Sequence, residues 1–98
     1  MKFITNYKEF GGDDNRSVLD FLREGSPDGK AEILKYLRSG KDDGVRCSGI
    51  FDYVKNEPQL DTVHLFTDGE YFWDSEEIYH YERYNVDLDI DFVRKVRS

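Results

Sequence analysis

The sequence has little of what several classes of protein require. Cys47 is the single cysteine among 98 residues, which excludes an intrachain disulfide framework and a cysteine-rich zinc site. No stretch approaches the roughly 18 consecutive apolar residues of a membrane-spanning helix, and residues 1–10 lack the apolar core of a signal peptide. These absences are typical of a chain that works in a reducing interior. We therefore expect a cytoplasmic protein with no membrane contact, in which Cys47 is buried as a small apolar side chain.

Positive charge is also scarce. The chain has 14 lysines and arginines against 21 aspartates and glutamates, which gives a formal net charge of −7. A small acidic domain is not expected to bind a phosphate backbone, because such binding needs a basic patch. Aromatic residues make up 15% of the chain, too many for a disordered segment. The length suits one domain spanning residues 1–98.

The negative charge is concentrated in one part of the sequence. Residues 1–55 have no net charge, residues 56–91 have a net charge of −10, and residues 92–98 have a net charge of +3. Such asymmetry indicates one face with a strong negative potential, which would attract a basic partner. The alternative is a solvated acidic surface that only keeps the protein in solution.

Two helices are expected in the first half of the chain. Asp14 or Asn15 can cap the first, whose apolar residues repeat at helical spacing up to a stop at Gly25. The Ser-Pro pair at residues 26–27 favours the start of the second helix, and Gly40 suits its C-terminal cap. The expected apolar positions of the two helices are Val18, Leu19, Phe21, Leu22, Ala31, Ile33, Leu34 and Leu37.

The middle of the chain changes to the period of strands. Apolar and polar residues alternate over residues 45–54 and again over residues 60–67. The Asp-Gly pair at residues 68–69 is a strong hairpin signal, since its residues tolerate the positive φ angles that a two-residue turn requires. Residues 71–73 then return as a third strand. The pattern predicts a three-stranded antiparallel meander.

Two further helices are expected at the C-terminal end. Asp74 and Glu77 have the spacing of a capping box, which predicts a helix from Ser75 to about Tyr84. Residues 86–92 alternate like a strand, but basic residues near the end of the chain favour a last helix. Asp89 would cap this helix, which would bury Ile90, Val93 and Val96.

The predicted fold class follows from the order of these elements. Two N-terminal helices, a three-stranded antiparallel meander and two C-terminal helices imply an α+β domain with its helices on one face of the sheet.

Residues that support catalysis or metal binding are few. His64 and His80 fall on different elements, and no sequence motif pairs Cys47 with His64 as a nucleophile and base. The carboxylates of residues 87–91 resemble the first half of a calcium loop but lack the glycine that turns it. We therefore expect no enzyme, no cofactor and no metal site, and a small enzyme or metal-binding domain is the least favoured hypothesis.

The stretch from Leu60 to Asp91 combines many aromatic rings with many carboxylates. Three strands and their helices cannot hide every ring, and tyrosine and tryptophan are typical anchors of protein interfaces. Acidic residues next to them would steer a basic partner into contact. The candidate partner-binding residues are Asp61, Asp68, Glu70, Tyr71, Trp73, Glu76, Glu77, Tyr79, Glu82 and Asp87.

A family resemblance extends over most of the chain. It rests on the hairpin and aromatic strand of residues 67–73, the Glu-Arg-Tyr-Asn-Val-Asp-Leu run at residues 82–88, and the segments 3–12 and 36–40. With these motifs the sequence resembles small bacterial immunity proteins found beside polymorphic toxins, including those of contact-dependent growth inhibition systems. The shared motifs are structural and include no catalytic signature.

The resemblance implies a cytoplasmic inhibitor that binds one cognate toxin domain tightly. Many such toxins are nucleases, and an RNase or tRNase is favoured here over a DNase. An acidic inhibitor can cover the basic substrate cleft of a nuclease or bind beside it, and the sequence does not decide between the two. Charge reversal at Glu76 and Glu77 would then weaken binding. The alternative hypothesis is an adaptor or regulatory module that binds a cytoplasmic protein unrelated to toxins.

Overall fold

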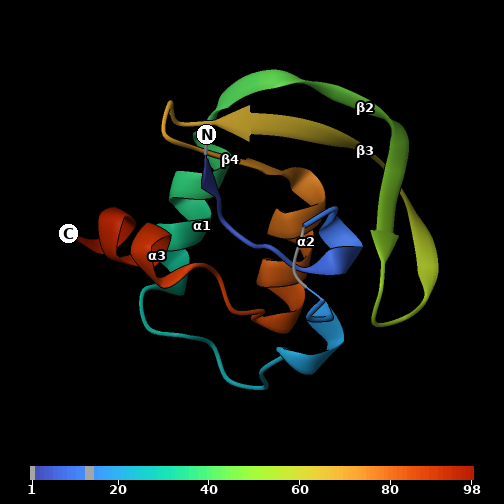
Figure 1. Ribbon diagram of the computed structural model, residues 1–98, viewed down its shortest axis with the longest axis horizontal. Coiled ribbons are helices and arrows are strands. Elements are labelled where there is room, and N and C mark those ends of the chain that lie inside the picture. The colour runs from blue at the N-terminus through green and yellow to red at the C-terminus, as the bar shows by residue number, and fades with distance from the viewer. Residues whose placement is uncertain (1, 13–14) are drawn as a thin grey trace.

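A four-stranded mixed sheet and three α-helices form the fold in the computed structural model, which describes residues 2–12 and 15–98 (Figure 1). The strands lie in the order β1-β4-β3-β2. β1 runs parallel to β4, whereas β2, β3 and β4 pair antiparallel. The elements are β1 Lys2–Phe3, β2 Lys41–Asp52, β3 Glu57–Thr67, β4 Tyr71–Asp74, α1 Lys30–Arg38, α2 Ser75–Tyr84 and α3 Ile90–Arg97, with the 3-10 turns η1 Lys8–Phe10 and η2 Val18–Asp20.

The structure is α+β, but the predicted arrangement of two N-terminal helices, a three-stranded antiparallel meander and two C-terminal helices is wrong. The sheet has a fourth strand, because Lys2 and Phe3 pair in parallel with Tyr71 and Phe72 of β4. A strand of two residues has no alternation that a sequence pattern could show. The sheet is therefore mixed and not a simple meander.

The segment predicted as the first N-terminal helix forms only the turn η2. Ser17 caps this turn, whereas Asp14 lies outside the described residues. The carboxylate of Glu9 accepts hydrogen bonds from the Ser17 hydroxyl and, at 2.8 Å, from the Val18 amide. Val18 is the buried residue of the turn and Leu19 is 49% exposed. A short helix gains its stability from packing of a continuous apolar face, and here Phe21 and Leu22 are only partly buried, which agrees with a single turn in place of a helix.

The other helices match their predicted positions more closely. α1 begins at Lys30 rather than at residues 26–27, because Gly29 takes a left-handed conformation with φ 75° just before it. The predicted helix over Ser75–Tyr84 is confirmed as α2, including both hydrogen bonds of its capping box. Among the described residues, no helix has both the length and the apolar character needed to cross a membrane.

The last helix is also confirmed, but it buries a different residue from those predicted. Asp89 caps α3 by accepting a hydrogen bond from the Asp91 amide. Ile90, expected to be buried, is 57% exposed, whereas Phe92 is fully buried. The Phe92 ring packs between Tyr71 and Trp73 of β4, with centroid distances of 5.1 and 5.7 Å. α3 is therefore fixed to the sheet by this aromatic ring.

Trp73 joins the sheet to α1 at the centre of the core. Its indole N–H donates to the carbonyl of Leu37 at 2.9 Å, near the C-terminal end of α1. Such carbonyls have no partner within their own helix, so the indole satisfies one of them. Gly40 lies against the same ring, where a Cβ atom would come within 2.6 Å of the indole. This close approach explains why a glycine follows α1.

The β2–β3 hairpin extends well past the rest of the sheet. β4 pairs with only residues 65–67 of β3, whereas β2 and β3 are twelve and eleven residues long. Three residues of β2, 46–48, lie opposite Val63 alone, between the pairs Val45↔His64 and Gly49↔Thr62. Such bulges bend a ribbon, and Figure 1 shows the hairpin arching over the sheet and down beside α2. Cys47 lies in this bulge and is exposed, so the prediction that it is buried is wrong.

Candidate interaction surface

Four of the ten residues predicted to bind a partner are buried inside the protein. Tyr71 and Trp73 are 2% and 0% exposed and belong to the core. Glu76 and Glu77 are 4% and 7% exposed, at the start of α2. The charge of Glu76 and Glu77 suggested a surface, but their carboxylates accept hydrogen bonds from the backbone amides of Phe51 and Asp74 inside the protein. None of the four is accessible to a partner in this structure.

Three more of the ten lie at the surface, Asp87 only partly exposed, but are already paired with a cation. Glu82 forms an ion pair with Arg38 of α1. Asp87 accepts two hydrogen bonds from the guanidinium of Arg23, at 2.6 and 2.7 Å. Glu70 lies 2.9 Å from the ammonium of Lys95. These three carboxylates hold neighbouring segments together and are not free to attract a basic partner.

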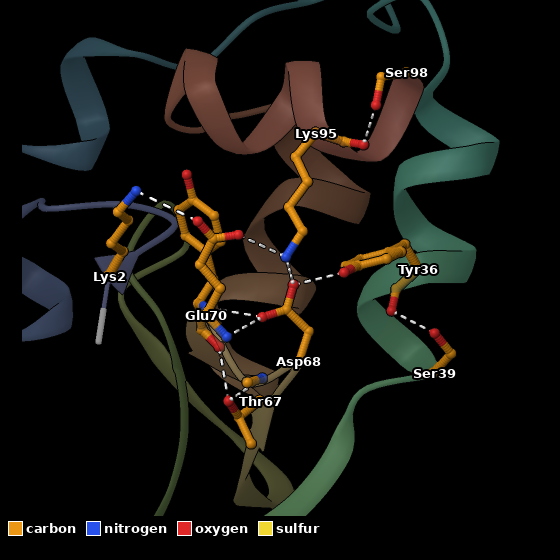
Figure 2. A network of polar contacts seen from close by, with 10 residues as sticks. Lys2, Tyr36, Ser39, Thr67, Asp68, Glu70, Lys95 and Ser98 are labelled. Carbon is orange, nitrogen blue, oxygen red and sulfur yellow. Dashed lines mark hydrogen bonds and ion pairs between the residues drawn. The ribbon is translucent and has the colours of Figure 1, made fainter.

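Asp68 is the centre of a polar network at the β3–β4 turn, shown in Figure 2. Its carboxylate accepts from Lys95 at 2.8 Å, from the Tyr36 hydroxyl at 2.5 Å and from two backbone amides of the turn. Burial acts to raise the pKa of Asp68, but these hydrogen bonds outweigh it and lower the pKa strongly. The network ties α1 and α3 to the turn, so Asp68 has a structural role.

The two remaining predicted residues, Asp61 and Tyr79, have different surroundings. Asp61 is exposed in β3 and has no ion pair among the described residues. The ring of Tyr79 is half-buried, and its hydroxyl donates to Asp52 at 2.7 Å. Burial and this hydrogen bond raise the pKa of Tyr79 to about 12. Asp61 is thus the one predicted acid that stays exposed and unpaired within the described part of the chain.

Asp52 holds the far end of the hairpin against α2. Its side chain is fully buried and accepts from the hydroxyls of Tyr79 and Tyr84 and from the amides of Val54 and Lys55. Burial acts to raise the pKa of Asp52, but the four hydrogen bonds outweigh it and lower the pKa to about 2. The carboxylate is therefore ionised at neutral pH and fully hydrogen-bonded, which favours burial of the charge.

Two side chains of α2 also cover the outer edge of β2 near its end. The amide of Phe51 donates to the carboxylate of Glu76 at 3.0 Å, and the amide of Tyr53 donates to Nε2 of His80 at 3.1 Å. Nδ1 of His80 lies 2.8 Å from the carbonyl of Glu76. Nε2 accepts a hydrogen bond only when His80 is neutral, and burial lowers the pKa of His80. Sheet edges are commonly protected in this way.

A pocket of about 250 Å³ with both apolar and charged lining residues lies between the N-terminal segment and α2. Glu77 lines it and hydrogen-bonds with the hydroxyl of Thr5, while Arg46 from the β2 bulge forms an ion pair with Asp74. Burial and the nearby Asp74 raise the pKa of Glu77 well above its usual range. A protonated Glu77 can donate a hydrogen bond. Among the described residues, no group of three or more histidines, cysteines and carboxylates could hold a metal ion.

The arch of the hairpin is an exposed surface that sequence reasoning missed. Leu60 is fully exposed and Val45 is 59% exposed, although both were expected to lie within half-buried strands. Over residues 41–49 of β2, no side chain is buried. The sequence did not show that β4 is short. Because β4 pairs with only residues 65–67 of β3, most of the β2–β3 hairpin has no third strand beside it. Asp43 and Glu57 on the same hairpin also have no ion pair among residues 2–12 and 15–98.

Comparison with models of protein families, with curated proteins and with solved structures finds no match for this chain.

Proposed function

We propose that this chain, as a single domain over residues 1–98, is a cytoplasmic immunity protein that binds and neutralises a cognate toxin domain. The toxin domain is a basic nuclease, an RNase or tRNase rather than a DNase. In this proposal the protein acts by binding alone, without catalysis, cofactor or direct contact with nucleic acid. The resemblance of the sequence to small immunity proteins and the concentration of acids in residues 56–91 support this function.

The observation that best supports the proposal is the composition of the exposed hairpin. It combines large exposed apolar side chains, Leu60 and Val45, with the unpaired carboxylates of Asp43, Glu57 and Asp61. Exposed apolar surface bordered by polar groups is typical of protein interaction sites. Carboxylates without a cation of their own are also the ones that can attract a basic partner.

The structure changes which residues should be tested. Glu76 and Glu77 are buried, so charge reversal there would disrupt folding and would not report on binding. Tyr71 and Trp73 are excluded for the same reason. Asp61 is the predicted residue best placed to contact the toxin domain.

Co-expression provides the direct test of this function. The probe is the C-terminal domain of the protein encoded immediately upstream of this gene, expressed in a bacterial host with and without this chain. We expect the domain to arrest growth alone and growth to be restored with the chain. We also expect a purified one-to-one complex of nanomolar or tighter affinity that weakens as salt rises. A domain that arrests growth in both cases would contradict the proposal, and a stable complex with a housekeeping protein instead would favour the adaptor alternative.

A further inference from the structure

The outer face of the hairpin forms a convex ridge. Side chains alternate between the two faces of a strand, so Thr62 and His64 point to the same face of β3, and Leu60 lies beside them in the register shift of residues 59–61. Val45 pairs with His64 and points the same way. All four side chains are exposed. Val63 and Ile50 are buried, which holds the arch in place from its other side.

The ridge is held at both ends, and between them the hydroxyl of Ser75 accepts a hydrogen bond from the His64 amide at 2.9 Å, while the side chains of the ridge stay exposed. One end is paired with β4 at residues 65–67, and the other is tied to α2 by Asp52, Glu76 and His80. The exposed middle is therefore presented in a fixed shape. Burying a rigid surface in an interface costs less conformational entropy than ordering a flexible loop.

The charge around the ridge indicates the chemistry of its partner. Asp43, Glu57 and Asp61 lie on the two strands and have no ion pair in the described part of the chain. The nearest cation in the bulge, Arg46, is already paired with the buried carboxylate of Asp74. Lys41 and Lys55 at the two ends of the hairpin also have no ion pair among the described residues, but the exposed carboxylates, the three above and Asp42, outnumber them. The complementary surface is therefore concave, apolar at its centre and mainly basic at its rim.

We infer that the convex ridge of the β2–β3 hairpin enters the basic substrate cleft of the toxin domain and blocks it directly. This inference rests on the proposed function and adds the contact surface and the mode of inhibition. Leu60 and Val45 contact the floor of the cleft, and Asp43, Glu57 and Asp61 pair with the lysines and arginines that otherwise bind phosphate. A convex surface suits a cleft because a flat partner could contact only the top of the arch.

The test compares two substitutions on the ridge with two matched substitutions elsewhere. Leu60→Asp and Asp61→Lys change the ridge, whereas Ile90→Asp and Glu24→Lys make the same kinds of change on α3 and on the loop before α1. All four residues are exposed, so the four variants should fold. Binding of the upstream-encoded toxin domain is measured by calorimetry. We expect the ridge variants to weaken binding on the order of 30-fold or more and the controls to change it by less than about threefold.

A second measurement tests whether the cleft itself is blocked. A labelled single-stranded oligonucleotide is bound to a catalytically inactive toxin domain, and this protein is added. We expect the oligonucleotide to be displaced by the wild-type protein and by Ile90→Asp, and only weakly by Leu60→Asp. Sedimentation of the free protein should show a monomer.

The outcomes separate the two proposals. If wild-type protein binds the toxin domain but Leu60→Asp and Asp61→Lys bind equally well, the inference is wrong and the proposed function stands. If the toxin domain binds this protein and the oligonucleotide together, direct blocking of the cleft is wrong. If the purified protein is a dimer that Leu60→Asp dissociates, the ridge is an interface between copies and the inference is wrong. If wild-type protein does not bind the toxin domain, the proposed function fails, and this inference fails with it.

Discussion

The buried carboxylate of Asp52 gives a quantitative prediction for the variant Asp52→Asn. The pKa of Asp52 falls from 3.8 to about 2 in the folded protein, since its hydrogen bonds favour the ionised form. When folding lowers the pKa of a carboxyl group by one, the folded protein gains about 1.4 kcal/mol of stability at neutral pH. We therefore expect the substitution to lower the free energy of unfolding by about 2.5 kcal/mol at pH 7. The amide keeps the size of the side chain, so this loss reports on the charge.

The pH dependence of that loss provides the sharper test. A carboxyl whose pKa is lowered by folding stabilises the protein above its unfolded pKa, and this stabilisation disappears as pH falls through the folded pKa. The difference between wild-type protein and Asp52→Asn should therefore be constant above about pH 5 and shrink toward zero near pH 2. Other groups that titrate, such as Glu77 and His80, are present in both proteins and cancel in the difference.

Urea denaturation followed by the fluorescence of Trp73 at several pH values gives both free energies. Asp28→Asn is the control, because Asp28 is exposed and its substitution should change stability by less than about 0.5 kcal/mol. Equal stability of wild-type protein and Asp52→Asn at pH 7 would refute the reasoning. A loss that is the same at pH 7 and at pH 3 would also refute it, because the effect would then come from packing.

Three further substitutions test other features of the structure. Trp73→Phe should destabilise the protein by about 2–4 kcal/mol in urea, since it leaves the Leu37 carbonyl unsatisfied and a gap in the core; affinity of the folded variant for a partner should not change. Tyr81→Phe should keep or raise the melting temperature, because the buried Tyr81 hydroxyl has no hydrogen-bond partner among the described residues. Glu77→Gln should keep the capping box, which accepts glutamine. Because burial raises the pKa of Glu77, wild-type protein should lose stability as pH rises from 4.5 to 8, and Glu77→Gln should lose less.

Local signals predicted local structure well in this chain. The capping box of Asp74 and Glu77 placed α2 correctly, because both of its hydrogen bonds form within one turn. The cap at Asp89 placed α3 for the same reason. The strand β1 could not be predicted, since its two residues pair with a partner about seventy positions away and have no pattern of their own. The turn η2 failed in the opposite way: its apolar spacing was helical, but only Val18 of that spacing is buried, and the segment forms a single turn.

The candidate surface was only partly predictable, because sequence order does not show which acids acquire a cation. Glu70, Glu82 and Asp87 all lie in the acidic block, and each pairs with a basic residue from the first half of the chain or from its C-terminal helix. Tyr71 and Trp73 had the composition of interface residues, yet β4 is a central strand and buries both. The exposure of Leu60 depended on the length of β4, which is set by long-range pairing.

The pattern of pairing explains why the net charge of the acidic block overstates its attraction for a partner. Exposed ion pairs add little to stability, but the cation of each pair cancels much of the negative potential of its carboxylate. Within the described part of the block, Glu57 and Asp61 stay exposed without an ion pair, and Asp43 lies with them on the hairpin. A partner steered by the whole block would show a steep dependence of its association rate on salt, whereas a partner steered by three carboxylates shows a shallow one. The paired acids are therefore poor choices for charge reversal. Charge reversal on the hairpin should lower the association rate the most.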